Sequence, residues 1–325
     1  MGTFSYEDKN LANEPFDRRS STASGPMRSP LTLRTADELA ISLDTANVVA
    51  AVRTSTGTWA ELFRAEAFHG LALVVAISAP DLDAADLVTL GKLGAWICAF
   101  DDMVDDGVIT DDELALRIAQ YELLVCGHAC PELAFDPVAR TLTEVLDALW
   151  CAPLGRSLWP LLTSQLVTSC KAMRWERSAT TAQRAGHDTS LDLYLRHRAN
   201  SICIGLVTTA AAMLIGEPAT LACIPAVLTA QRHAATAVRI ANDLATWSRK
   251  QTEGSPVNAL LFTNGAGSDL LQARAESERR SLAFVLGNLH PSIPRTAAFL
   301  ERLTACMMAI YRRGDLTDVR HDQPA

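Results

Sequence analysis

Four carboxylates stand within six residues of this chain, at Asp101, Asp102, Asp105 and Asp106, directly after the apolar stretch Leu93 to Phe100. On a helix, Asp101 and Asp105 share one face, and like charges at that spacing repel each other. Acids near a helix C-terminus also oppose the helix dipole. A divalent cation reverses these penalties, and clustered carboxylates with room for water and phosphate suit Mg²⁺. The run therefore predicts a magnesium site, and the alternative is a solvated acidic helix end.

A second polar cluster lies about 140 residues downstream, on the helix predicted at 219–251. Asn242, Thr246 and Lys250 are spaced i, i+4, i+8 and share one helix face. Amide and hydroxyl oxygens are neutral donors suited to Mg²⁺, while Arg249 and Lys250 could hold phosphate. A polar surface stripe explains this helix equally well when it is taken alone. Its combination with the aspartates is what makes the pattern specific.

The elements that must position these residues are helices. Beyond Thr35 the apolar residues recur with helical periodicity, and Gly, Pro, Asp or Asn mark the breaks. Several helices are nearly apolar all round, which favours an all-α bundle with buried central helices around an apolar cavity. We expect about ten helices, at 36–53, 57–78, 83–104, 111–127, 137–150, 157–182, 190–215, 219–251, 268–289 and 294–313.

Composition narrows the function classes. The 325 residues are 49% hydrophobic and carry a net charge of −8, so a nucleic-acid partner is not expected. No uninterrupted apolar stretch reaches 18 residues, so no membrane span is predicted. Eight cysteines without a CxxC pair indicate free thiols in a reducing compartment, and we expect a cytoplasmic protein. A single domain is predicted over 35–315, between a disordered tail at 1–34 and a flexible one at 316–325.

Together, the two polar motifs resemble those of bacterial class I terpene synthases. The family pattern is an aspartate-rich motif followed by NDxxSxxxE, and this chain has DDMVD from Asp101 and NDLATWSRK from Asn242. The resemblance covers roughly 57–315 and implies one class I α domain. It implies three Mg²⁺ ions, with Mn²⁺ as a substitute, that bridge the motifs to a substrate diphosphate. Asp101 and Asp105 would hold two ions, and Asn242 and Thr246 the third.

The resemblance also assigns the diphosphate contacts. Tyr194-Leu-Arg196-His-Arg198 matches the Tyr-x-x-x-Arg context of the family's diphosphate sensor, so Arg198 is the assigned sensor and Arg196 the reserve, with a helix break expected near Ser201 and Ile202. Lys250 departs from the pattern, because it replaces the family's metal-binding Glu and an ammonium group cannot ligate a metal. Either water fills that metal position or Lys250 contacts diphosphate directly, and Arg249 is the neighbouring cation that could hold phosphate. The resemblance further assigns Tyr311 and Arg312 to diphosphate, and Asp102 belongs to the predicted catalytic set with Asp101, Asp105 and Arg198.

The resemblance implies a cyclase that ionises a linear prenyl diphosphate and releases diphosphate and a terpene hydrocarbon or alcohol. The chain has no DxDD motif, so the reaction should start by ionisation rather than by protonation. Abundant small residues and only 6% aromatics favour geranylgeranyl over farnesyl diphosphate, and a bicyclic diphosphate also fits. The alternatives are a chain-elongating trans-prenyl diphosphate synthase and a non-enzymatic helical interaction protein. A homodimer is among the expected assemblies.

Overall fold

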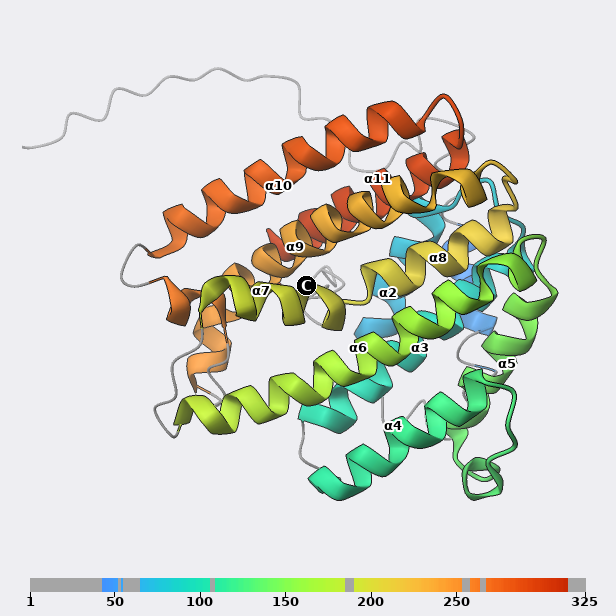
Figure 1. Ribbon diagram of the computed structural model, residues 1–325, viewed down its shortest axis with the longest axis horizontal. Coiled ribbons are helices and arrows are strands. Elements are labelled where there is room, and N and C mark those ends of the chain that lie inside the picture. Colours follow the sequence, from blue (N-terminus) through green and yellow to red (C-terminus); the bar gives the residue numbers. More distant parts are fainter. Residues whose placement is uncertain are drawn as a thin grey trace, which may run out of the picture.

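The computed structural model describes residues 43–51, 54, 65–105, 109–184, 190–252, 258–263 and 267–314. Side chains are described in these ranges except at 65–69, 180–184 and 249–252. The described chain is helical throughout its regular elements (Figure 1), which confirms the predicted all-α class. The tails predicted at 1–34 and 316–325 lie outside these residues.

The described helices lie close to the predicted ranges, and residues 43–51 are helical as well. The start of the helix predicted at 57–78 falls outside the described residues as far as 64, and α6 begins two residues earlier than predicted. Two short 3-10 turns, η2 and η3, were not predicted. The bounds are α2 Ala65–Ser78, α3 Ala84–Asp105, α4 Asp111–Val125, η2 Pro131–Leu133, α5 Pro137–Cys151, α6 Gly155–Arg184, α7 Leu191–Ser201, α8 Ile204–Ile215, α9 Thr220–Thr252, η3 Ala259–Phe262, α10 Gly267–Leu289 and α11 Pro294–Tyr311.

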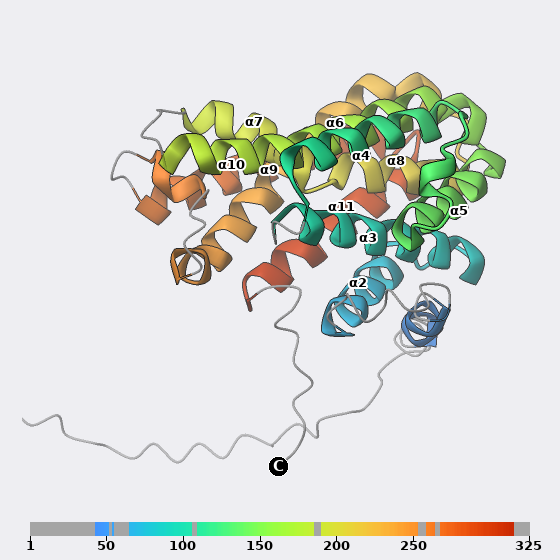
Figure 2. The same ribbon diagram turned by 90° about the horizontal axis from the view of Figure 1, so that it is seen from below.

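The helices pack in layers around α3, α8 and α11. Figure 2 shows α2 on the opposite side of the molecule from α4 and α6, with α3 and α11 between them. The helix α9 packs along both α10 and α11, and α7 packs on α6 and α9. Of the 12 residues of α8, 10 are buried, which confirms the expectation of an apolar helix inside the bundle.

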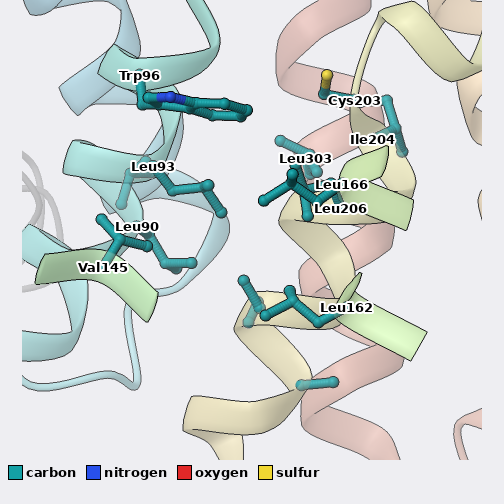
Figure 3. Close-up of a cluster of buried hydrophobic side chains, with 14 of the residues drawn as sticks. Leu90, Leu93, Trp96, Val145, Leu162, Leu166, Cys203, Ile204, Leu206 and Leu303 are labelled. Carbon is teal, nitrogen blue, oxygen red and sulfur yellow. The ribbon is translucent and has the colours of Figure 1, made fainter. Parts of the chain in front are cut away.

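The helix α3 carries the apolar stripe that leads to the aspartates. Its side chains at Leu87, Leu90, Leu93, Trp96 and Phe100 are each at most 1% exposed. Figure 3 shows Leu90, Leu93 and Trp96 pointing towards the facing helices, where the labelled side chains include Leu162, Leu166, Leu206 and Leu303. The interior between α3, α6, α8 and α11 is therefore apolar up to the last turn of α3, where the carboxylates begin.

The helix predicted at 190–215 is broken into α7 and α8. Cys203 has φ 58°, a left-handed conformation that costs a non-glycine residue about 1–2 kcal/mol. The break follows Ser201 and Ile202, where the family resemblance placed it. Residues 191–215 are long and apolar enough to cross a membrane by composition alone, but 72% of that window is buried in the protein. The break and the burial are typical of two consecutive helices in the core of a protein.

One packing contact between α9 and α10 predicts an acid-sensitive stability. His233 Nδ1 lies 2.6 Å from Glu278 Oε2, and Arg274 Nε donates to Glu278 at 2.7 Å. Burial would raise the pKa of Glu278, but the hydrogen bonds from His233 and Arg274 outweigh it and hold that pKa below its ordinary value.

We expect Glu278→Gln to lower the free energy of unfolding by about 1 kcal/mol at pH 7, because the pair is partly open to water. A carboxylate with a depressed pKa stabilises the fold above its unfolded value of 4.5 and loses that contribution as the pH falls through the lower folded value. The difference in Tm between the two proteins should therefore shrink on acidification, measured by circular dichroism from pH 7 to pH 3. Glu276→Gln, in an exposed pair with Arg279, is the control and should show no such trend. An undiminished difference at pH 3 would contradict this account.

Candidate active site

The acidic motif lies at the C-terminal end of α3, as predicted. Asp101 follows the fully buried Phe100 and is half-buried, while Asp102 and Asp105 are exposed. Trp96 and Phe100 stack on each other, and Tyr121 of α4 packs edge-on against both rings. The carboxylates thus stand where an aromatic part of the core meets the surface. Asp106 lies outside the described residues.

Arg198 is the buried cation next to this motif. It lies in the last turn of α7, is 2% exposed, and forms an ion pair with Glu176 of α6, which is 5% exposed. Its Nη1 donates to Ser201 Oγ at 3.3 Å. Its Nε is buried and has no hydrogen-bond partner among the described residues. A buried guanidinium that keeps an unused donor is prepared to bind a further acceptor.

The electrostatic neighbours of Arg198 show that the distant motifs converge. Burial and the guanidinium of Arg239 lower the pKa of Arg198, while the carboxylates of Asp243, Asp101 and Asp105 oppose the shift. Asp101 also acts on the thiol of Cys203 at the α7–α8 break, whose pKa burial raises to about 12. The end of α3, the end of α7 and the part of α9 that carries Arg239 and Asp243 therefore lie within electrostatic range of one another.

Asp243 joins α9, α7 and η3 at the base of this site. Its side chain is fully buried and accepts hydrogen bonds from Tyr194 Oη at 2.7 Å, from Arg239 Nε at 2.9 Å and from the backbone nitrogen of Ala259 at 3.2 Å. Asn258 Nδ2 donates to its backbone oxygen at 2.7 Å. Burial would raise the pKa of Asp243, but the two nearby guanidinium groups hold that pKa below its ordinary value.

Asn242 and Thr246 lie one turn apart on α9, and Asn242 is rotated by about 100° around the helix axis from Asp243. Asn242 is half-buried, Thr246 is 3% exposed, and Thr246 Oγ1 donates to the backbone oxygen of Asn242 at 2.8 Å. That bond uses the hydroxyl proton and leaves the lone pairs of the oxygen for another partner. The structure therefore presents an amide and a hydroxyl oxygen on one turn, as the sequence predicted.

The family described as "Terpene synthase family 2, C-terminal metal binding" matches residues 92–279, more than half of the chain and a range that includes both motifs and Arg198. The chain belongs to this family. A (12E)-labda-8(17),12,14-triene synthase of Streptomyces cyslabdanicus is 30% identical over 181 residues, which are 54% of this chain and 53% of that protein. The chain thus spans about half the length of the curated relative that it matches.

Solved structures of terpene synthases have the same fold as this terpene synthase family member. A linalool/nerolidol synthase from Streptomyces clavuligerus, in complex with 2-fluorogeranyl diphosphate, gives a TM-score of 0.66 at 17% identity and covers 84% of this chain and 94% of its own. A 2-methylisoborneol synthase from Streptomyces coelicolor A3(2) gives 0.65 at 16%, covering 84% and 91%. At these identities the likeness shows the fold, which confirms the predicted class I terpene synthase architecture.

Two assigned diphosphate residues lie away from Arg198. Arg196 lines an outer cleft of ≈ 670 Å³ between α6, α7, α9 and α10, together with His233 and Glu278. Arg312 lines a second cleft of ≈ 610 Å³, against the α9 face of Ala241 and Ala245 rather than that of Asn242. These placements favour Arg198 over Arg196 as the diphosphate contact.

The structure describes the side chains of only some of the other residues assigned to diphosphate. Tyr311 also borders the second cleft, but it is buried and lies within electrostatic reach of Arg239. Arg249 and Lys250 lie in the last turns of α9, where side chains are not described. Their roles toward diphosphate stay predictions.

The oxygen donors of the two motifs are of the kinds that suit Mg²⁺. The part of the chain that the structure describes has no group of three or more His, Cys, Asp or Glu side chains able to hold a metal ion. Asp101 and Asp105 supply carboxylates from α3, and Asn242 and Thr246 supply neutral oxygens from α9. Mg²⁺ commonly binds through one or two carboxylates, several waters and substrate phosphates. The donor set matches that requirement, and the family description confirms the metal-binding character of the domain.

Three residues that contact the candidate site were given no role by the sequence analysis: Glu176, Tyr194 and Asp243. Asp243 follows Asn242 directly and is rotated by about 100° around the helix axis, so it cannot share its face. Its spacing of four residues from Arg239 was the available signal for an ion pair. Glu176 offered no signal, because its pairing with Arg198 depends on how α6 and α7 pack.

Proposed function

We propose that this protein is a Mg²⁺-dependent class I diterpene cyclase that ionises geranylgeranyl diphosphate and closes the resulting carbocation into rings. The supporting observation is that the carboxylates of Asp101 and Asp105 lie within electrostatic range of the buried Arg198, on the helix α7 that packs against α9. The helix α9 carries Asn242 and Thr246. Farnesyl diphosphate is the second substrate to consider. The labdane name of the curated relative is that of a C20 skeleton and favours the longer chain.

The residues of this chain divide the reaction between an ionic end and an apolar end. Bound Mg²⁺ would neutralise charge on the departing diphosphate. Arg198 would donate hydrogen bonds to the same group, and it stabilises the separated diphosphate more than the intact ester because more charge develops there. Leu93 and Trp96 lie in the apolar interior beyond the motif. Such an interior excludes water from a carbocation, and an aromatic face attracts positive charge.

Incubation of the protein with Mg²⁺ and single diphosphates tests this function. Geranylgeranyl diphosphate, farnesyl diphosphate and a labdane-type bicyclic diphosphate are supplied separately, and hexane extracts are analysed by gas chromatography with mass detection. We expect a C20 hydrocarbon or alcohol from geranylgeranyl diphosphate, and none when EDTA removes the metal. Product from the bicyclic substrate alone would reassign the substrate, and longer diphosphates formed with isopentenyl diphosphate would indicate chain elongation instead. The absence of product from every substrate would refute the proposal.

A further inference from the structure

The helix α6 carries neither metal motif, yet its Glu176 pairs with the buried Arg198. The side chains of Glu176 and Arg198 are 7% and 3% exposed, so the pair is shielded from water on both sides. Arg177, the next residue, instead pairs with Asp111 at the start of α4, with 2.9 Å between Arg177 Nε and Asp111 Oδ1. Adjacent residues of α6 thus form ion pairs with different helices, and it is Glu176 that pairs with Arg198.

The nitrogen atoms of the Arg198 guanidinium differ in their contacts. Its Nη1 contacts Glu176 and Ser201, whereas its Nε is buried without a hydrogen-bond partner among the described residues. A planar guanidinium can present two acceptors with two different edges, because its five donors diverge in fixed directions. A carboxylate that holds one edge therefore fixes the direction in which the remaining donors point.

We propose that Glu176 is a positioning residue of the diphosphate site. It orients Arg198 so that the Nε edge is free for a phosphate oxygen, and it keeps a buried cation in place before the substrate arrives. This inference rests on the proposed function, because it treats Arg198 as a diphosphate contact. Glu176 itself acts through Arg198 and does not contact the substrate.

A double-mutant cycle with inorganic pyrophosphate tests this role. Glu176→Gln, Arg198→Gln and the double variant are compared with wild type for Mg²⁺–pyrophosphate affinity by calorimetry and for kcat/KM with geranylgeranyl diphosphate. We expect Glu176→Gln to weaken pyrophosphate binding about tenfold, as the loss of a charge-assisted contact would. In the Arg198→Gln background the same change should have no further effect, because the residue acts only through the arginine.

Controls separate positioning from stability. Glu144→Gln removes a partly exposed ion pair with Lys92 between α5 and α3 and should leave pyrophosphate affinity unchanged. If Glu176→Gln does not fold, Glu176→Asp keeps the charge on a shorter side chain and should weaken binding by a smaller factor. A Glu176→Gln variant that lowers Tm but binds pyrophosphate as wild type does would overturn the proposal. So would equal losses in both backgrounds.

The same data distinguish this inference from the function on which it rests. A wild-type protein that binds Mg²⁺–pyrophosphate but makes no product would refute the cyclase, while the role of Glu176 would still be decided by the binding cycle. A wild-type protein that makes product, with Glu176→Gln indistinguishable from it, would overturn the positioning role alone. A wild-type protein that neither binds nor turns over would refute both.

Discussion

Asp101→Asn should lower turnover about 1,000-fold or more and leave the fold intact. The substitution keeps the size of the side chain but removes the charge that would hold Mg²⁺ against the diphosphate. The Tm should change little, because the substitution removes both the repulsion between Asp101 and Asp105 and the attraction between Asp101 and Arg198. Product is measured by gas chromatography and Tm by circular dichroism. The Mg²⁺ concentration for half-maximal rate should also rise, since an amide is a weaker ligand.

The matched control is Asp112→Asn, an exposed acid in the first turn of α4 for which we predict no catalytic role. It should keep turnover within about twofold of wild type, because the change lies outside the proposed metal site. Turnover by Asp101→Asn within tenfold of wild type would refute the assignment of the acidic motif. Equal losses in both variants would point to a general effect of surface charge.

Asp243→Ala should lower the free energy of unfolding by about 3–5 kcal/mol, the range for removing one partner of a buried ion pair. The carboxylate is fully buried, and its removal leaves the buried charge of Arg239 and the hydroxyl of Tyr194 without their acceptor. Urea unfolding followed by circular dichroism measures the loss. Binding of Mg²⁺–pyrophosphate should fall as well, because Asp243 joins α7, which carries Arg198, to α9, which carries Asn242.

Asp147→Ala, an exposed aspartate of α5, is the control and should change the stability by no more than about 0.5 kcal/mol. Asp243→Asn adds a sharper comparison, because it keeps the shape and removes the charge. It should be destabilised as well, since Arg239 then lacks a counter-charge. A loss below about 1 kcal/mol for Asp243→Ala would show that the network contributes little to folding.

The helices were predictable because their signals are local. The stripe of α3 repeats every three or four residues, and the start of α4 carries a complete capping box between Thr110 and Glu113. The break at Cys203 could not be read from periodicity, since the apolar pattern runs through it from α7 to α8. Only the resemblance to the terpene synthase family placed a break there.

The candidate site was predictable where residue type determines chemistry, as for the carboxylates of α3 and for Asn242. The residues that the sequence analysis missed act through partners far along the chain. Tyr194 reaches Asp243 across 49 positions, and a pairing of that kind depends on how α7 and α9 pack. Arg196 and Arg198 could not be separated with certainty from the sequence, because both sit in the same motif and only the packing of α7 buries one of them.

The break between α7 and α8 also determines whether this apolar segment could span a lipid bilayer. Unbroken, the 25 residues from Leu191 to Ile215 would form a rod of about 37 Å, longer than the roughly 30 Å hydrocarbon layer of a bilayer. The two actual helices have 11 and 12 residues and reach only about 17 and 18 Å. One residue with a left-handed backbone thus divides an apolar segment of spanning length into two pieces, neither of which could cross a bilayer by itself.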